Sequence, residues 1–148
     1  MKGLEKVSSQ LMFAQKGFMN TTIDDLTKSA GVSHGNFFVH YSKREDLIIN
    51  AIEKIGKSIY ERFLALADED MELEYILNAH LEAIKEYEPL YYFMVAEGVF
   101  LPEQARTAFF VLQNGIRHWM KKTSSHKCRD VCPFNFGTEN RIFERLLK

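Results

Sequence analysis

The longest regular pattern in this chain is a stripe of apolar residues that recurs at every fourth position along one segment. The stripe consists of Leu47, Ala51, Ile55, Ile59 and Phe63, and Ile48 and Ile52 widen it. A spacing of four residues places side chains on one face of an α-helix. Ser42 can cap the start of this helix, with Glu45 completing a capping box, and the acidic residues 68–70 interrupt the pattern. We therefore predict a long helix that ends at about Ala67.

Two shorter helical patterns precede this stripe and are separated by a glycine. Thr22 and Asp25 have the spacing of a capping box, and the inward-facing residues Ile23, Leu26 and Ala30 follow at helical intervals. Gly31 then supplies the positive φ that often ends a helix, and Ser33 can cap the next one. In that second helix, Phe37 and Tyr41 lie on the same side. The pattern predicts a helix-turn-helix.

The remaining apolar patterns are also helical, and no segment shows the alternation of a β-strand. They predict helices over about residues 4–16, closed by Gly17, over 70–87, from Pro89, and from Pro102 through Trp119, with a short helix after about Glu139. The apolar side of the helix over 70–87 is predicted to carry Leu73, Ile76, Leu77, His80, Leu81 and Ile84. The predicted fold class is all-α. A three-helix head, residues 1–47, is joined by the long helix to a short helical body, residues 48–148.

The outer face of the helix that follows Gly31 carries polar side chains. His34, Asn36 and His40 lie opposite the apolar side, and Gly35 allows a phosphate or a base edge to approach the backbone. A short helix that is held by its apolar side and presents polar groups outward fits the major groove of DNA. We therefore predict DNA binding by the head. The alternative is a helix-turn-helix-shaped module that binds proteins.

Several segments together resemble the TetR family of bacterial repressors. They are residues 13–18 (FAQKGF), 21–26 (TTIDDL), 30–33 (AGVS) and 45–47 (EDL), which agree in order and spacing over roughly a third of the chain. The resemblance implies an all-helical homodimer whose head binds a palindromic operator in double-stranded DNA. It also implies that the body binds a small-molecule effector and mediates dimerisation.

The resemblance also assigns residues, position by position. Thr22, Ser33 and Arg44 fall on phosphate-contacting positions, and His34, Asn36 and Val39 fall where base edges are read. The full predicted set of DNA-contacting residues is Thr22, Ser33, His34, Gly35, Asn36, Phe38, Val39, His40, Lys43 and Arg44. Two residues depart from the family pattern. Phe38 replaces a tyrosine whose hydroxyl contacts the DNA backbone, and Lys43 replaces a serine cap.

Charge does not indicate a nonspecific DNA-coating protein. The formal net charge is −1, and the first fifty residues hold six Lys and Arg against five Asp and Glu, whereas the remainder holds thirteen against fifteen. Affinity must then come from a few placed contacts, from helix N-termini and from binding two half-sites. The composition is that of a globular protein without a membrane span, so we expect a cytoplasmic protein with reduced cysteines and no cofactor.

The body contains an aromatic segment, residues 89–100 (PLYYFMVAEGVF), which can line a site for an apolar effector. The candidate pocket residues are His80, Tyr91, Met94, Glu97 and Phe109. The alternative is that these aromatic side chains only fill the core and a dimer interface.

The last segment, residues 123–148, fits the family least and supports at most one short helix. Cys128, Cys132 and His126 are too few and too irregularly spaced to predict a metal site. No nucleophile or phosphate-binding motif indicates catalysis. The prediction is a transcriptional repressor that an apolar effector releases from DNA. The alternative is a protein-interaction module or a ligand or redox sensor with impaired operator binding, and a thiol enzyme is a third class.

Overall fold

The computed structural model describes the backbone of residues 2–68 and 71–124 and the side chains of residues 8–68 and 71–121. All regular structure in that part is helical, which confirms the predicted all-α class. The elements are α1 (Lys2–Lys16), α2 (Ile23–Ala30), α3 (His34–His40), α4 (Arg44–Leu66), α5 (Leu73–Ile84), a 3₁₀ turn η1 (Lys85–Tyr87), α6 (Glu88–Ala96) and α7 (Glu103–Ser124). Across these ranges, no helix combines the length and apolar composition that crossing a bilayer requires.

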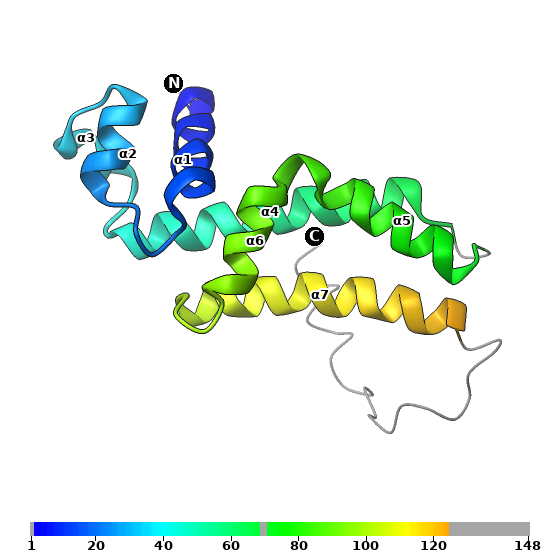
Figure 1. The fold of residues 1–148 in the computed structure, drawn as a ribbon. Coiled ribbons are helices and arrows are strands. Elements are labelled where there is room, and N and C mark those ends of the chain that lie inside the picture. The colour runs from blue at the N-terminus through cyan, green and yellow to red at the C-terminus, as the bar shows by residue number, and fades with distance from the viewer. Residues whose placement is uncertain (1, 69–70, 125–148) are drawn as a thin grey trace.

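The first three helices form the head at one end of the molecule (Figure 1). α1 packs on α2, and α2 packs on α3. Phe13 and Phe18 are fully buried with ring centroids 4.8 Å apart, and Leu26 and Phe37 are nearly so. Burial of a large side chain stabilises by about 1.5 to 3 kcal/mol. A few aromatic residues therefore hold the three short helices together.

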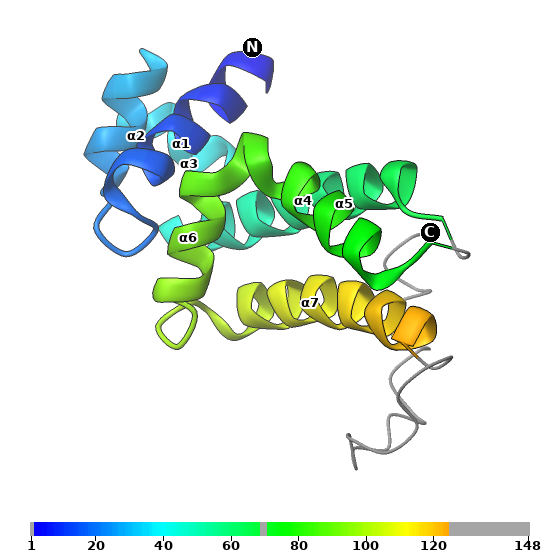
Figure 2. The same cartoon turned by 45° about the vertical axis from the view of Figure 1, so that its right-hand side comes forward.

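α4 is the element that the head and the body share (Figures 1 and 2). It leaves the head and runs the length of the body, where α5 and α7 pack against it. Its predicted stripe is buried along the whole helix, and Ile48, Ile52, Ile55, Ile59 and Phe63 are each 0% exposed. α6 crosses between the two parts and packs against α1. The body thus contacts the head through α6 as well as through α4.

The start of α4 differs from the prediction. The N-cap is Lys43 rather than Ser42, and the amide of Lys43 donates to Asp46 Oδ2 at 3.2 Å. The ammonium group of a lysine cannot accept a backbone N–H, so only the carboxylate half of a capping box is formed. Asp46 and Glu45, in the first turn, also favour the positive end of the helix dipole. Capping by Ser42 and Glu45 is therefore wrong by one residue.

The predicted helix over residues 70–87 is shorter and differently oriented. α5 covers Leu73–Ile84 and is followed by η1. It buries Ile76, Ala79 and Ala83 and leaves Leu73, Leu77 and Leu81 exposed. Small alanines allow close approach to α4 and α7, which overrides the preference for burying the larger leucines. Pro89 lies in the first turn of α6, as predicted.

Replacement of Phe63 tests the core that joins α4, α5 and α7. Its ring lies 6.0 Å from that of Trp119 and 6.4 Å from that of His80, in edge-on arrangements. Phe63→Ala should lower the free energy of unfolding by about 3 to 5 kcal/mol, measured by urea titration. The control Leu64→Ala, at a side chain that is 38% exposed, should cost about 1 kcal/mol or less. Equal losses in the two variants would refute this description of the core.

Candidate nucleic-acid interface

α3 is positioned by its caps and by one buried aromatic side chain. Gly31 has φ of +67° and ends α2, and Ser33 Oγ accepts the amide of Asn36 at 3.3 Å to begin α3. Phe37 is 7% exposed and anchors the inner face of this two-turn helix. Tyr41 lies beside it, with ring centroids 5.7 Å apart. A short helix with both ends and one face fixed presents its other face in a constant orientation.

The outer face of α3 is open to solvent. Val39 is 75% exposed and Phe38 is 51% exposed, and the side chain of His34 is 54% exposed. Gly35 and His40 are also exposed, and Asn36 is half-buried. The predicted α3 contacts thus lie together on one accessible helix. Their individual roles on DNA stay predictions.

His34 has a partner that the sequence did not reveal. Its Nε2 contacts Asp24 Oδ1 from the first turn of α2. Both side chains are more than half exposed, so this ion pair contributes little stability. It nevertheless places a carboxylate beside the start of α3. A base or phosphate that binds His34 must compete with Asp24.

Thr22 is exposed and begins α2 through the predicted capping box. Thr22 Oγ1 accepts the amide of Asp25 at 3.2 Å, and the amide of Thr22 donates to Asp25 Oδ2 at 3.0 Å. Lys16 Nζ donates to the other oxygen, Oδ1, at 2.6 Å. The hydrogen bond from Lys16 and then those from Thr22 hold the pKa of Asp25 well below its usual 3.8. This carboxylate joins the ends of α1 and α2.

Arg44 was predicted to contact a phosphate, but in the structure its guanidinium binds backbone carbonyl groups of the protein itself. Nη1 donates to the carbonyl oxygens of Met19 and Thr21, both at 2.9 Å, and to that of Phe18 at 3.4 Å. The side chain is only 22% exposed. Arg44 therefore ties the first turn of α4 to the loop between α1 and α2. Lys43, which precedes it, is exposed.

Glu97 binds the same loop from the side of the body. Its Oε2 accepts the amides of Phe18 at 2.8 Å and Met19 at 3.1 Å. Gly17, with φ of +82°, leaves room for this approach. A Cβ there would lie 2.8 Å from Phe93 Cδ1 and closer still to Glu97 Oε1. We call Glu97, Arg44 and the backbone of residues 17–21 the loop clamp.

Sequence reasoning assigned Glu97 to the effector pocket and did not find the loop clamp. The two ends of the contact are 79 residues apart, and no local motif marks it. Gly17 is the one local signal, because a glycine at a helix end permits a close approach of another chain segment. Its predicted role was only to end α1.

The other pocket candidates gather in the body. The rings of His80 and Tyr91 are 6.1 Å apart, those of Tyr91 and Phe109 are 5.7 Å apart, and Met94 is fully buried in the same core. Burial lowers the pKa of His80, whose buried Nδ1 has no hydrogen-bond partner among the described residues. These side chains pack on one another as core residues do. An effector site among them stays a prediction.

Cys128 and Cys132 lie outside the described residues. Within the residues that the structure does describe, no group of three or more His, Cys, Asp or Glu side chains is placed to hold a metal ion.

Removal of the Glu97 carboxylate tests the loop clamp. Glu97→Ala leaves the amides of Phe18 and Met19 without their acceptor and should lower the free energy of unfolding by about 1 to 2 kcal/mol in a urea titration, a value reduced for partial exposure. Glu97→Gln keeps a carbonyl acceptor and should cost about half as much. Glu53→Ala, an exposed acidic residue on α4, is the control and should have little effect. A loss in Glu97→Ala no larger than the control's would contradict the clamp.

The Asp25 network predicts a pH dependence. Because the pKa of Asp25 is lower in the folded state than its usual value, its stabilising effect is fully present above that usual value and is lost progressively as the pH falls below it through the lowered, folded-state pKa. The stability difference between wild type and Asp25→Asn should therefore be largest near neutral pH and shrink toward about pH 2. Urea titrations at several pH values measure it. A difference that grows on acidification would be inconsistent with the network.

Comparisons with known proteins agree with this arrangement. A family model of bacterial regulatory proteins of the tetR family matches residues 11–51, from the second half of α1 into α4. An uncharacterised HTH-type transcriptional regulator, YerO of Bacillus subtilis, is 28% identical over 105 residues, which cover 67% of this chain and 36% of YerO. The negative regulator IcaR of the biofilm operon icaADBC in Staphylococcus epidermidis is 24% identical over 63 residues, which cover 43% of this chain and 34% of IcaR.

The chain thus spans about a third of the length of these two curated relatives. The crystal structure of a transcriptional regulator of the TerR/AcrR family from Aquifex aeolicus matches with a TM-score of 0.65 at 24% identity, over 85% of this chain and 72% of that one. This likeness supports the all-helical fold of this chain. The family model over the helix-turn-helix and the relative that extends beyond it support a transcriptional regulator similar to the TetR family.

Proposed function

We propose that this chain is a DNA-binding transcriptional repressor that binds a palindromic operator as a homodimer and is released by a small apolar effector. The observation that carries the proposal is α3: two exposed turns, anchored by Phe37, within the segment that matches the tetR family model. A helix of this kind enters the major groove and reads base edges. A cytoplasmic location, where the DNA lies, is part of the same proposal.

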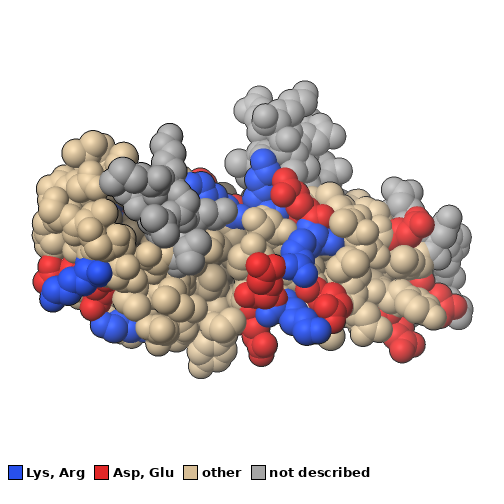
Figure 3. All heavy atoms as spheres, turned by 90° about the horizontal axis from the view of Figure 1, so that it is seen from above, with Lys and Arg blue, Asp and Glu red and all other residues tan. Residues whose placement is uncertain are grey.

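The proposed contacts divide by chemistry. His34, Asn36 and Val39 on α3 read base edges. The hydroxyls of Thr22 and Ser33 and the exposed ammonium of Lys43 bind phosphates. Lys and Arg are interspersed with Asp and Glu on the face shown in Figure 3, which therefore carries no single basic patch. Arg44 acts mainly through the loop clamp, which fixes the orientation of α2 and α3.

Repression and dimerisation rest on separate arguments. The curated relative IcaR is a negative transcriptional regulator. A palindromic operator requires two heads whose α3 helices are about 34 Å apart, or one turn of DNA. The body exposes the large apolar side chains Tyr92, Val95, Val99, Phe100 and Phe110. Apolar surface of this kind favours association of two bodies.

The loop clamp gives a route by which an effector releases the operator. Tyr91 is a candidate effector contact on α6, and Glu97 caps the end of the same helix while it binds the loop at the head. An effector that shifts α6 therefore moves the acceptor of the Phe18 and Met19 amides. The two heads of a dimer then lose the spacing that successive major grooves require.

The direct experiment is a selection of bound sequences from random duplex DNA with the full chain. We expect enrichment of one palindrome, and we expect Asn36→Ala to relax the preference at one position of each half-site while Lys57→Ala, on α4, leaves the preference unchanged. Failure to enrich any palindrome would favour the alternative, a helix-turn-helix-shaped module that binds protein partners.

Phe38 provides a second test because its hydroxyl-free ring is exposed on α3. Phe38→Tyr should restore one neutral hydrogen bond to a phosphate, tightening binding by about threefold to tenfold for specific and unrelated DNA alike. The dependence of affinity on salt should not steepen, since a neutral hydroxyl displaces no counterion. Fluorescence anisotropy at several salt concentrations measures both quantities. Unchanged affinity would place Phe38 away from the DNA backbone.

A further inference from the structure

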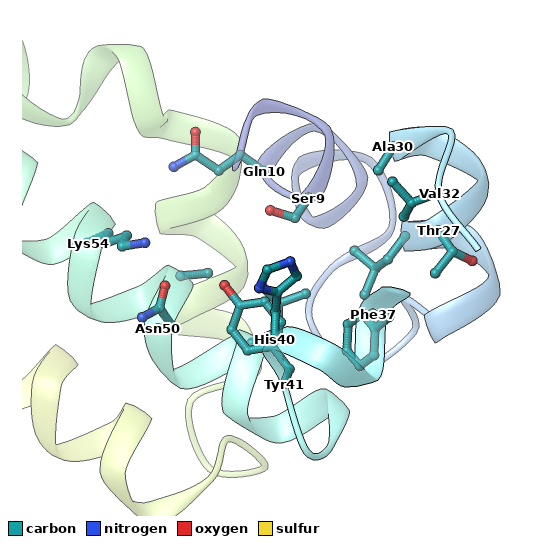
Figure 4. Close-up of a pocket in the computed structure, with 13 residues that line it drawn as sticks. Ser9, Gln10, Thr27, Ala30, Val32, Phe37, His40, Tyr41, Asn50 and Lys54 are labelled. Carbon is teal, nitrogen blue, oxygen red and sulfur yellow. The ribbon is translucent and has the colours of Figure 1, made fainter. Parts of the chain in front are cut away.

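The head contains a cavity of ≈ 350 Å³ that the proposed function does not use (Figure 4). It lies among α1, α2, α3 and α4, behind the helix proposed to read DNA. A volume of this size corresponds to about ten water molecules and falls within the range of small-molecule sites. Single-water voids between packed helices are much smaller.

One side of the cavity is apolar. Leu26 of α2, Phe37 of α3 and Leu47 of α4 are buried side chains that line it, and Val32 from the turn is half-buried beside them. These are residues of the head core. An apolar part of a ligand on this side would displace water from the apolar side chains that line the cavity. That displacement favours binding.

The other side of the cavity is polar and positively charged. Gln10 of α1, His40 of α3, and Asn50 and Lys54 of α4 line it (Figure 4). None of these four side chains has a hydrogen bond or ion pair within the described part of the chain, and Lys54 and His40 are exposed enough to meet a ligand from solvent. Four polar groups from three helices thus converge without protein partners.

The sign of the charge selects the ligand. Lys54 carries a full positive charge, and the described residues that line the cavity include no Asp or Glu. An ammonium group with no carboxylate among the described lining residues favours an anion, and amide and imidazole N–H groups can donate to the same oxygens. A purely polar anion such as phosphate fits the cavity less well, because it would leave the apolar side in contact with water.

We propose that this cavity is a binding site for an amphipathic organic anion, with its carboxylate at Lys54 and its apolar chain against Leu26, Phe37 and Leu47. The site lies between the three helices of the head and the first half of α4, and none of the effector candidates of the body lines it. Its existence does not depend on DNA binding. Its consequence for operator affinity does rest on the proposed function, because a ligand behind α3 restrains that helix.

The test uses the full chain and three ligands with the same ten-carbon tail: decanoate, decanol and decyltrimethylammonium. Isothermal titration calorimetry should detect saturable binding of one decanoate per chain, and about tenfold or weaker binding of the neutral and cationic ligands. Amide chemical shifts from NMR should change for residues of α1, α3 and α4 around the cavity. Shifts confined to the body, or equal affinities for the three ligands, would overturn the proposal.

Two matched variants on α4 distinguish decanoate binding in the cavity from nonspecific attraction of the anion to surface lysines. Lys54→Met should weaken decanoate binding about tenfold, whereas Lys57→Met, one turn away and outside the lining, should not. Both side chains are exposed, so neither change threatens folding. A Lys54→Met affinity equal to wild type would overturn the site. Operator binding, measured separately by anisotropy, distinguishes failure of this site from failure of the DNA-binding proposal.

Discussion

The structure depends on the way that two distant side chains, Glu97 and Arg44, hold the loop between α1 and α2. Glu97 accepts two backbone amides of the loop between α1 and α2, and Arg44 donates to three of its carbonyl oxygens. Buried backbone groups outside regular structure need partners, and here charged side chains supply them. Because Glu97 ends α6 and Arg44 begins α4, the loop is the point where head and body meet. The orientation of α2 and α3 follows from it.

This constraint explains how a head with a small core keeps a fixed position on the body. The aromatic core of Phe13, Phe18 and Phe37 stabilises the three helices, but so few residues bury too little surface to be secure alone. The shared helix α4 and the loop clamp add contacts at two separate points. In the proposed function this attachment links the effector site to the head, since α6 also carries Tyr91. A displacement of α6 reaches the head without passing through the length of α4.

The sequence predicted the elements whose signals are local. Caps at Thr22 and Ser33, the turn at Gly31 and the stripe from Leu47 to Phe63 were found because each is encoded within a few residues. The candidate α3 contacts lie together for the same reason. The predictions that were wrong concern features that packing between helices decides. α5 buries its alanines instead of Leu73 and Leu77, and the cap of α4 shifts to the residue whose amide can reach Asp46. The roles of Glu97 and Arg44 and the cavity behind α3 were missed because they join helices far apart in the sequence.

The most direct test of the central claim is amide hydrogen exchange of the intact protein, read by NMR at Phe18 and Met19. If Glu97 holds these amides as described, both should exchange far more slowly than amides of an unstructured peptide, with opening free energies of several kcal/mol, close to that of the α1 core. Exchange at the rate of a freely solvated loop would contradict the account, because Glu97 would then not hold the loop between α1 and α2.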